Sequence, residues 1–162
     1  MARYDFWDLL DLLASYQVSW SRIARADDRT RQPVRLLIKT VGVRILAECD
    51  QDRLSLTFYK GNEDVFDDPA TLLTHIRAAG SAATKAPRSI FDLVPTMCDL
   101  SRACRVLDQN RDDTVKLTFL TPTTLVELDF FDDHIEYSVF EKQAQPATWE
   151  ELVFELELFT RE

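Results

Sequence analysis

The sequence predicts an α+β fold in which helices pack on an antiparallel sheet. Apolar residues recur at spacings of three and four near both ends of the chain, two separate regions alternate with a period of two, and turn residues lie between them. The expected element order is α-β(β)β-αα-βββ-α. A length of 162 residues corresponds to one domain, 1–162, and we detect no internal repeat beyond a loose echo of hairpin followed by helix.

The first expected helix runs from about Asp5 to Ala24. Three aspartates in its early turns have the sign that the helix dipole favours, and Trp7 lies off the apolar stripe. The stripe consists of Phe6, Leu9, Leu10, Leu13, Tyr16, Trp20 and Ile23.

From Val34 the period changes to two, which predicts strands. The parity slips by one residue near Thr40–Gly42, and this slip indicates either a β-bulge in one long strand or two separate strands. A further strand follows a turn placed at Asp50–Gln51. In that register the apolar pairs are Ala47 with Leu54, Ile45 with Leu56, and Val43 with Phe58.

Two helices are expected in the middle of the chain. Asp68 and Pro69 form a cap and a first-turn proline, and Gly80 is a plausible end for the first of them. Ser89 begins the second, which we expect to kink at Pro95 and then to continue to about Leu107.

Strands are expected at about 114–121, 124–131 and 134–141, followed by a helix from Trp149 with a capping box of Thr148 and Glu151. Their apolar residues form three cross-strand rows on one face, which fixes the register. The last helix is apolar around more than half its circumference, so its spare side either is covered in the core or forms a dimer contact. The rows are Val115–Phe130–Ile135, Leu117–Leu128–Tyr137 and Phe119–Val126–Val139.

The chain is acidic, with 19 basic and 28 acidic residues and a formal net charge of −9. Such a field repels nucleic acid and anionic membranes and attracts cationic partners, but an acidic balance also simply keeps bacterial proteins soluble, and both interpretations stay open. The N-terminal stretch lacks the pattern of a signal peptide, and we expect a cytoplasmic protein. Three cysteines at spacings that match no zinc motif are expected to be buried thiols, and we expect no metal or other cofactor.

The opposite face of the second three-stranded unit is acidic at one end and apolar at the other. Asp129 and Glu136 are directly opposed like charges, which a cation or a basic side chain from another molecule would relieve. Three interpretations stay open: a solvated face, a protein-binding face and, least favoured, a divalent cation site. The residues assigned to partner binding are Glu127, Asp129, Asp132, Asp133, Glu136, Leu120, Leu125 and Phe140.

Catalytic motifs are lacking. Three glycines provide no phosphate-binding loop, the two histidines lie far apart in sequence, and a paired-carboxylate hydrolase at Asp129 and Glu136 or in the 63–68 loop is the remaining enzyme hypothesis. His134 and His75 are expected to be ordinary surface or flanking residues. We therefore expect a non-catalytic protein whose partner is another protein.

In size, charge and its acidic cluster the chain resembles bacterial immunity proteins of contact-dependent inhibition and related toxin systems. This resemblance implies that its carboxylates neutralise a basic, nuclease-like toxin domain. The element order is also similar to that of the small dimeric chaperones of type III secretion. The second resemblance implies a homodimer whose apolar row Leu120, Leu125 and Phe140 holds an extended client segment, although the two middle helices and the third strand of the second half depart from that family.

Overall fold

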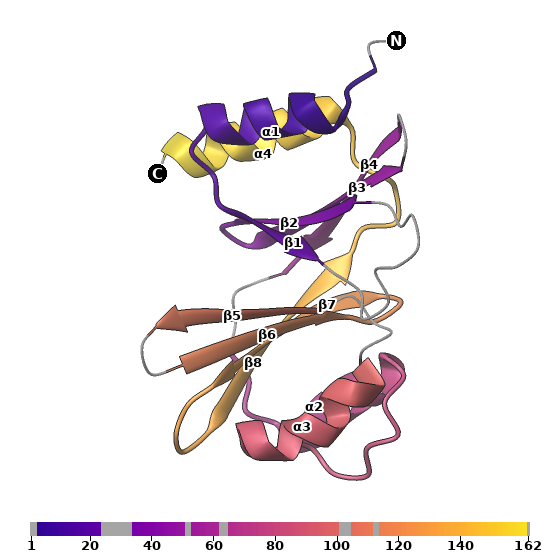
Figure 1. Cartoon of the computed structure of the whole chain (residues 1–162), viewed down its shortest axis with the longest axis vertical. Helices are drawn as coiled ribbons and strands as arrows, with labels where there is room; N and C mark the ends of the chain where they lie inside the picture. Colours follow the sequence, from indigo (N-terminus) through magenta and orange to yellow (C-terminus); the bar gives the residue numbers. More distant parts are fainter. Residues whose placement is uncertain are drawn as a thin grey trace.

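The computed structural model describes residues 3–23, 34–50, 53–61, 65–100, 105–111 and 114–161, and these form four helices and one eight-stranded antiparallel sheet (Figure 1). The predicted α+β class is confirmed. The strand order is β1-β2-β3-β4-β8-β7-β6-β5. The elements are α1 (Phe6–Ser15), β1 (Trp20–Ile23), β2 (Val34–Thr40), β3 (Val43–Asp50), β4 (Arg53–Lys60), α2 (Pro69–Ala78), α3 (Ile90–Asp99), β5 (Arg105–Arg111), β6 (Thr114–Leu120), β7 (Thr124–Phe130), β8 (Ile135–Lys142) and α4 (Trp149–Arg161).

The sheet folds over on itself where β4 meets β8, so the molecule has four layers (Figure 1). The ladder between these two strands joins Tyr59 to Lys142 and Lys60 to Glu141. Helices α1 and α4 cover the outer face of β1–β4, and α2 and α3 cover the outer face of β5–β8. The inner faces of the two half-sheets pack against each other.

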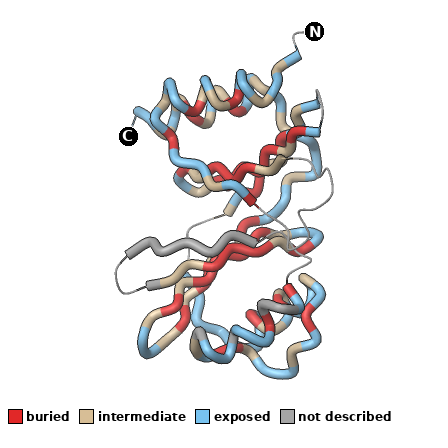
Figure 2. Tube along the Cα trace, in the orientation of Figure 1, coloured by how far each residue is buried: buried red, intermediate tan, exposed pale blue. Residues whose placement is uncertain are grey.

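Buried side chains form one cluster between each pair of neighbouring layers (Figure 2). Leu9 and Leu13 of α1 and Leu152 and Leu156 of α4 pack on the first half-sheet. Leu72 and Ile76 of α2 pack on the second. The cluster between the half-sheets consists of Ile23, Leu37, Leu46, Tyr59, Leu125 and Phe140. Burial of each large apolar side chain contributes about 1.5–3 kcal/mol.

The first helix is shorter than predicted. It ends at Ser15, and Gln17 then adopts a left-handed backbone conformation with φ of 56°. Residues Trp20–Ile23 form β1 rather than a final helical turn, and Ala24 lies outside the described residues. The prediction failed because Trp20 and Ile23 continue the helical spacing, although Trp20 is exposed and only Ile23 is buried.

The slip near Thr40–Gly42 marks two strands, since β2 ends and β3 begins there. Gly42 has φ of 71° at the turn, a conformation in which glycine carries no Cβ penalty. The predicted register of the next hairpin is wrong by two residues, because Ala47 pairs with Leu56 and Ile45 with Phe58. A shift of two leaves every side chain on its predicted face.

The second middle helix also differs from prediction. Helix α3 spans Pro95 and ends at Asp99, whose carboxylate accepts hydrogen bonds from the Ser81 hydroxyl and the Ala82 N–H, both at 3.2 Å. Residues 105–111 form strand β5, paired with β6, instead of continuing the helix to Leu107. Cys104 and the side chain of Cys98 lie outside the described part of the chain, whereas Cys49 is a buried free thiol.

The predictions for the rest of the second half are confirmed. All three predicted cross-strand rows occur in the ladders of β6, β7 and β8. Asp68 caps α2, and Thr148 and Glu151 form the capping box of α4 through reciprocal hydrogen bonds of 3.2 Å. Alternation with a single consistent face was the strongest signal in the sequence, and it predicted the strands that bury that face on α2.

The last three strands of each half, β2–β4 and β6–β8, have the same pairing, displaced by 81 residues. Adding 81 to both members of Val34↔Cys49 gives Val115↔Phe130, and adding it to Val43↔Lys60 gives Thr124↔Glu141; all four pairs are present. The two isolated bridges, Leu56↔Ala147 and Phe66↔Tyr137, are related in the same way. The chain therefore contains two structural repeats related by a pseudo-two-fold axis at the β4–β8 junction. The sequence analysis did not detect them.

Each repeat has the order α-β-β-β-β-α, and the final helices are exchanged. Helix α2 follows β4 but covers the second half-sheet beside α3, while α4 follows β8 but covers the first half-sheet beside α1 (Figure 1). The helix starts also correspond. Asp5 and Asp8 form a capping box on α1, and the Ser89 hydroxyl accepts from the Asp92 N–H at the start of α3.

Candidate functional site

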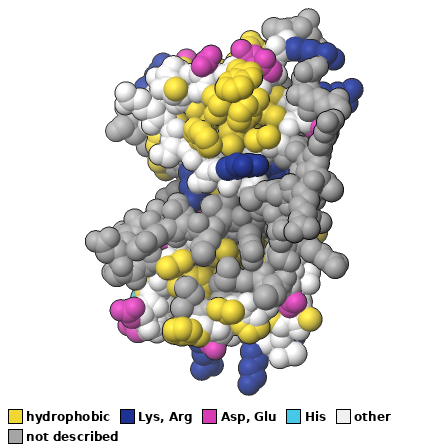
Figure 3. All heavy atoms as spheres, in the orientation of Figure 1, with side chains coloured by type: hydrophobic (Ala, Val, Ile, Leu, Met, Phe, Trp, Pro, Cys, Tyr) yellow, Lys and Arg dark blue, Asp and Glu magenta, His cyan; other side chains and the backbone are white. Residues whose placement is uncertain are grey.

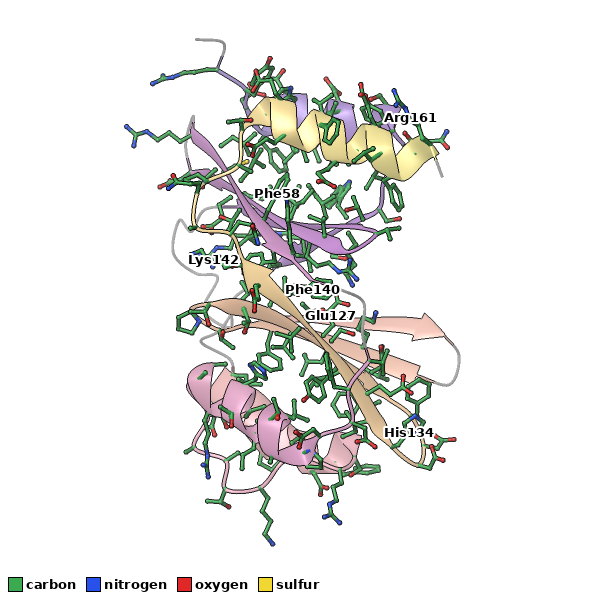
Figure 4. All side chains as sticks on the ribbon, turned by 180° about the vertical axis from the view of Figure 1, so that it is seen from behind. Phe58, Glu127, His134, Phe140, Lys142 and Arg161 are labelled. Carbon is green, nitrogen blue, oxygen red and sulfur yellow. The ribbon has the colours of Figure 1, made fainter. Side chains whose placement is uncertain are left out.

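The apolar end of the predicted binding face lies inside the molecule. Leu125 and Phe140 are fully buried and Leu120 is partly buried, all in the cluster between the two half-sheets. Figure 4 shows Phe140 in this middle layer. The expectation of an exposed apolar row is wrong, because the face that it shares with Glu127 packs on β1–β4. In the folded chain this row is not open to a client segment.

The basic side chain that the acidic face required comes from the same chain. Glu127 on β7 is buried and its carboxylate accepts hydrogen bonds from the Arg44 guanidinium on β3, through Nε to Oε1 and through Nη2 to Oε2 at 3.2 Å. Arg44 also donates to the backbone oxygens of Thr40 and Val43 at 2.7 and 3.1 Å, and its Cζ lies 4.4 Å from the Phe140 ring centroid. These contacts join the two half-sheets across the interior.

Burial by itself raises the pKa of Glu127, but the hydrogen bonds and charge of Arg44, with Lys39 and Lys116 nearby, outweigh it. The net result is a pKa below the usual value, so Glu127 is ionised in the folded protein. Lys116 Nζ lies 3.5 Å from Glu127 Oε2 and 3.8 Å from Asp129 Oδ1. At this end of the face the carboxylates are thus paired largely with basic side chains of the same chain.

Asp129 and Glu136 are opposed in the β7–β8 ladder, as predicted. Burial is the main cause that raises the pKa of Asp129, with Glu127 and Glu136 adding to it and Lys116 opposing it. The Glu136 carboxylate is engaged by His134, whose Nε2 lies 3.1 Å from Glu136 Oε1. Each member of this carboxylate pair therefore already has a basic neighbour.

The exposed part of the predicted site is the tip of the β7–β8 hairpin, where Figure 4 shows His134. His134 Nδ1 lies 2.6 Å from Asp133 Oδ1, and the imidazole stacks on Phe131 with ring centroids 4.5 Å apart. Hydrogen bonding to Asp133 and then to Glu136 raises the pKa of His134, and the same contact lowers the pKa of Asp133. The tip thus carries a histidine hydrogen-bonded between two carboxylates, which favour its protonated form, with Asp132 beside them.

A depression of about 210 Å³ lies beside this tip and brings in residues from the start of α2. Asp67, Asp68 and Arg88 line it together with Asp133, His134 and Tyr137. Tyr137 also stacks obliquely on Phe66, with centroids 5.5 Å apart. Within the described ranges, no group of three or more histidine, cysteine or acidic side chains is arranged to hold a metal ion.

A second acidic surface was not recognised in the sequence. The outward sides of α1 and α4 form what we call the acidic helical face: seven acidic side chains against two basic ones give it a net charge of −5. Trp7, Phe154 and Leu158 are exposed on the same two helices, at 71%, 59% and 44%. The charged residues are Asp5, Asp8, Asp11, Glu150, Glu151, Glu155 and Glu157, with Arg3 and Arg161.

The signal for this face was present in the sequence as Trp7, Phe154 and Leu158 lying off the buried stripes. What could not be seen is that α1 and α4, far apart in the chain, lie side by side. Tyr4 stacks on Trp149 with ring centroids 4.0 Å apart, and the Tyr16 hydroxyl donates to Glu157 Oε1 at 3.3 Å. The two helices thereby lie against each other on the same outer side of the molecule.

Comparison with known proteins found no matching family model, no similar curated protein and no similar solved structure. Across the described residues, no helix is long and apolar enough to cross a membrane. The function is therefore inferred from the surfaces of this chain.

Proposed function

We propose that this chain is a non-catalytic binding protein that captures a basic partner protein, in the manner of a toxin-neutralising immunity protein. The observation that carries the proposal is the acidic helical face, which combines a net charge of −5 with exposed Trp7, Phe154 and Leu158 on the same two helices. Protein-binding surfaces combine exposed aromatic anchors with complementary charge at the rim. Acidic residues around an aromatic side chain suit a partner that offers lysine or arginine.

The hairpin tip supports the same function less well. Two of its carboxylates, Asp133 and Glu136, are already hydrogen-bonded to His134, and Arg88 lines the adjoining depression. The apolar residues expected beside them are buried. We therefore assign the main contact to the acidic helical face and keep Asp129, Asp132, Asp133 and Glu136 as a second, smaller contact.

The test compares two charge reversals of equal size on the full chain. Tagged wild type, Asp11→Lys/Glu150→Lys and Asp132→Lys/Asp133→Lys are used to capture partners from native lysate at low and high salt, with mass spectrometry as the readout. Asp11, Glu150, Asp132 and Asp133 are all exposed, and none of the four caps a helix. We expect a basic protein that is retained at low salt and lost at high salt, because surface charges are screened.

Loss of that protein only with the helical reversal would support the assignment. Loss only with the hairpin reversal would transfer the function to the hairpin tip. Equal capture by all three baits, or capture that persists at high salt, would contradict an electrostatic binding function.

A further inference from the structure

The two repeats expose an aromatic residue at the same position of their first helix. Trp7 and Phe91 each precede the aspartate that lies three residues after the helix-capping residue, in the stretches Asp5–Asp8 and Ser89–Asp92. Trp7 is 71% exposed and Phe91 is 83% exposed. Packing within the monomer therefore does not explain why both repeats carry an aromatic residue at this position.

The surroundings of Phe91 differ from those of Trp7. On the first half-sheet the residues that flank α1 contact α4 at two places, Tyr4 stacking on Trp149 and the Tyr16 hydroxyl donating to Glu157. On the second half-sheet a depression of about 900 Å³, lined by both apolar and polar side chains, lies between α2 and α3 beside Phe91. Its lining includes Pro69, Leu73, Ala83, Pro87, Pro95 and Thr96.

The two surfaces also differ in net charge. Residues 67–99, which contain α2, α3 and their connection, carry four acidic and three basic side chains, a net charge of −1, against −5 for the acidic helical face. Around the depression itself the charges are Lys85, Arg88 and Asp92. Two copies of the acidic helical face would repel each other, whereas two copies of the α2–α3 surface would not.

We propose that the α2–α3 surface is the interface of a two-fold symmetric homodimer, in which Phe91 of each copy enters the depression of the other. In such a contact the same residues supply both the projecting ring and the cavity that receives it, which is the requirement of a two-fold interface. Val94 and Pro95, three and four residues after Phe91, extend the exposed apolar stripe along α3. The exposed Asp92 of one copy then faces the basic pair Lys85 and Arg88 of the other, so charge complementarity accompanies the apolar contact.

Figure 3 shows basic side chains projecting beyond α2 and α3 at the lower end of the view; acidic and basic side chains both lie at the upper end, where α1 and α4 are. In a dimer formed through the lower end, both acidic helical faces point outward at opposite ends. The dimer contact and the proposed partner site are therefore separate surfaces, and purified protein alone suffices to test the first.

The experiment is sedimentation velocity of the full chain from about 1 to 500 µM, a range that covers weak and moderate dimer affinities. The variants are Phe91→Asp and its counterpart in the other repeat, Trp7→Asp, which makes the same change at an exposed aromatic of an equivalent helix position. We expect a wild-type dimer, a loss of about tenfold or more in dimer affinity for Phe91→Asp because interface aromatics act as anchors, and no loss for Trp7→Asp. Far-UV circular dichroism confirms that each variant is folded.

A wild type that stays monomeric over the whole range would overturn the proposal. So would equal weakening by the two substitutions. Species larger than a dimer that disappear with either substitution would also overturn it, because they would indicate that the acidic helical face of one copy binds the α2–α3 surface of the next.

Discussion

The buried ion pair between Arg44 and Glu127 joins the two repeats, and its contribution to the free energy of unfolding can be predicted from the structure. Removing one member leaves the other charged and desolvated, which costs about 3–5 kcal/mol, whereas replacing both by apolar residues is often close to neutral. The two side chains are only 7% and 4% exposed, so solvent offers little compensation.

The structure ranks the two single substitutions. Glu127→Leu leaves Arg44 with the Thr40 and Val43 carbonyl oxygens and the Phe140 ring, so we expect a loss of about 3 kcal/mol. Arg44→Met leaves Glu127 with Lys116 at 3.5 Å and removes one donor from each of the Thr40 and Val43 backbone oxygens, the second of which keeps the Thr40 hydroxyl at 3.4 Å, so we expect a loss of about 5 kcal/mol. The double variant should lose only about 1–3 kcal/mol, the cost of the hydrogen bonds that Arg44 no longer donates to the backbone.

The assay is urea unfolding of all four proteins at pH 7, followed by tryptophan fluorescence and circular dichroism. The coupling energy should be several kcal/mol in the direction that makes the double variant more stable than the sum of the singles. Additive losses within about 0.5 kcal/mol would refute the view that the pair acts as a unit. So would a loss below about 1 kcal/mol for Glu127→Leu, because that is the size of an exposed pair.

Two further predictions concern the same region. Asp129→Asn should stabilise the protein at pH 7 by a few tenths to about 1 kcal/mol, because burial and two neighbouring carboxylates raise the pKa of Asp129 in the folded state. A group with a raised folded pKa contributes stability below its unfolded pKa and loses that stability as pH rises through the folded value. The difference in unfolding free energy between this variant and wild type should therefore vanish at about pH 3 in urea titrations. A difference that stays constant with pH would contradict this cause. Gly61→Ala should destabilise by about 1–3 kcal/mol, since its Cβ would lie 2.6 Å from the Val139 carbonyl oxygen and 3.1 Å from Phe140 Cα, both backbone atoms at the β4–β8 junction. If Gly61→Ala unfolded at the same temperature as wild type, the two strands would be able to move apart without loss of stability, contrary to this prediction.

Local sequence patterns correctly predicted those helices and strands that were supported by two independent signals. The β6–β8 unit combined strict alternation with agreement across three strands, and α2 and α4 combined an amphipathic stripe with a capping residue at Asp68 and Thr148. Where one signal stood alone the prediction failed. Helical spacing through Trp20 and through Leu107 fell on strands β1 and β5, because short segments can satisfy both periods by chance.

The site prediction failed for a different reason. The acidic row was placed on the correct side of the sheet, but whether that side meets solvent depends on the other half-sheet. Arg44 and Glu127 are 83 residues apart, and only the fold shows that they meet. The repeat that brings them together is not visible in the sequence, because corresponding positions can differ even in residue class: Arg44 corresponds to Leu125 and Leu46 to Glu127.

That correspondence explains why a charged pair lies in this interior. The pseudo-two-fold axis relates the contact of Arg44 with Glu127 to that of Leu125 with Leu46, so the interface has one charged side and one apolar side. Two first repeats from different molecules, packed in the same way, would bury two arginines against leucines, and two second repeats would bury two glutamates against leucines. Each mispairing leaves two desolvated charges without a partner, a cost of several kcal/mol apiece. Only the pairing of a first repeat with a second satisfies both, so the Arg44–Glu127 pair favours assembly within one chain over exchange between identical halves of different chains.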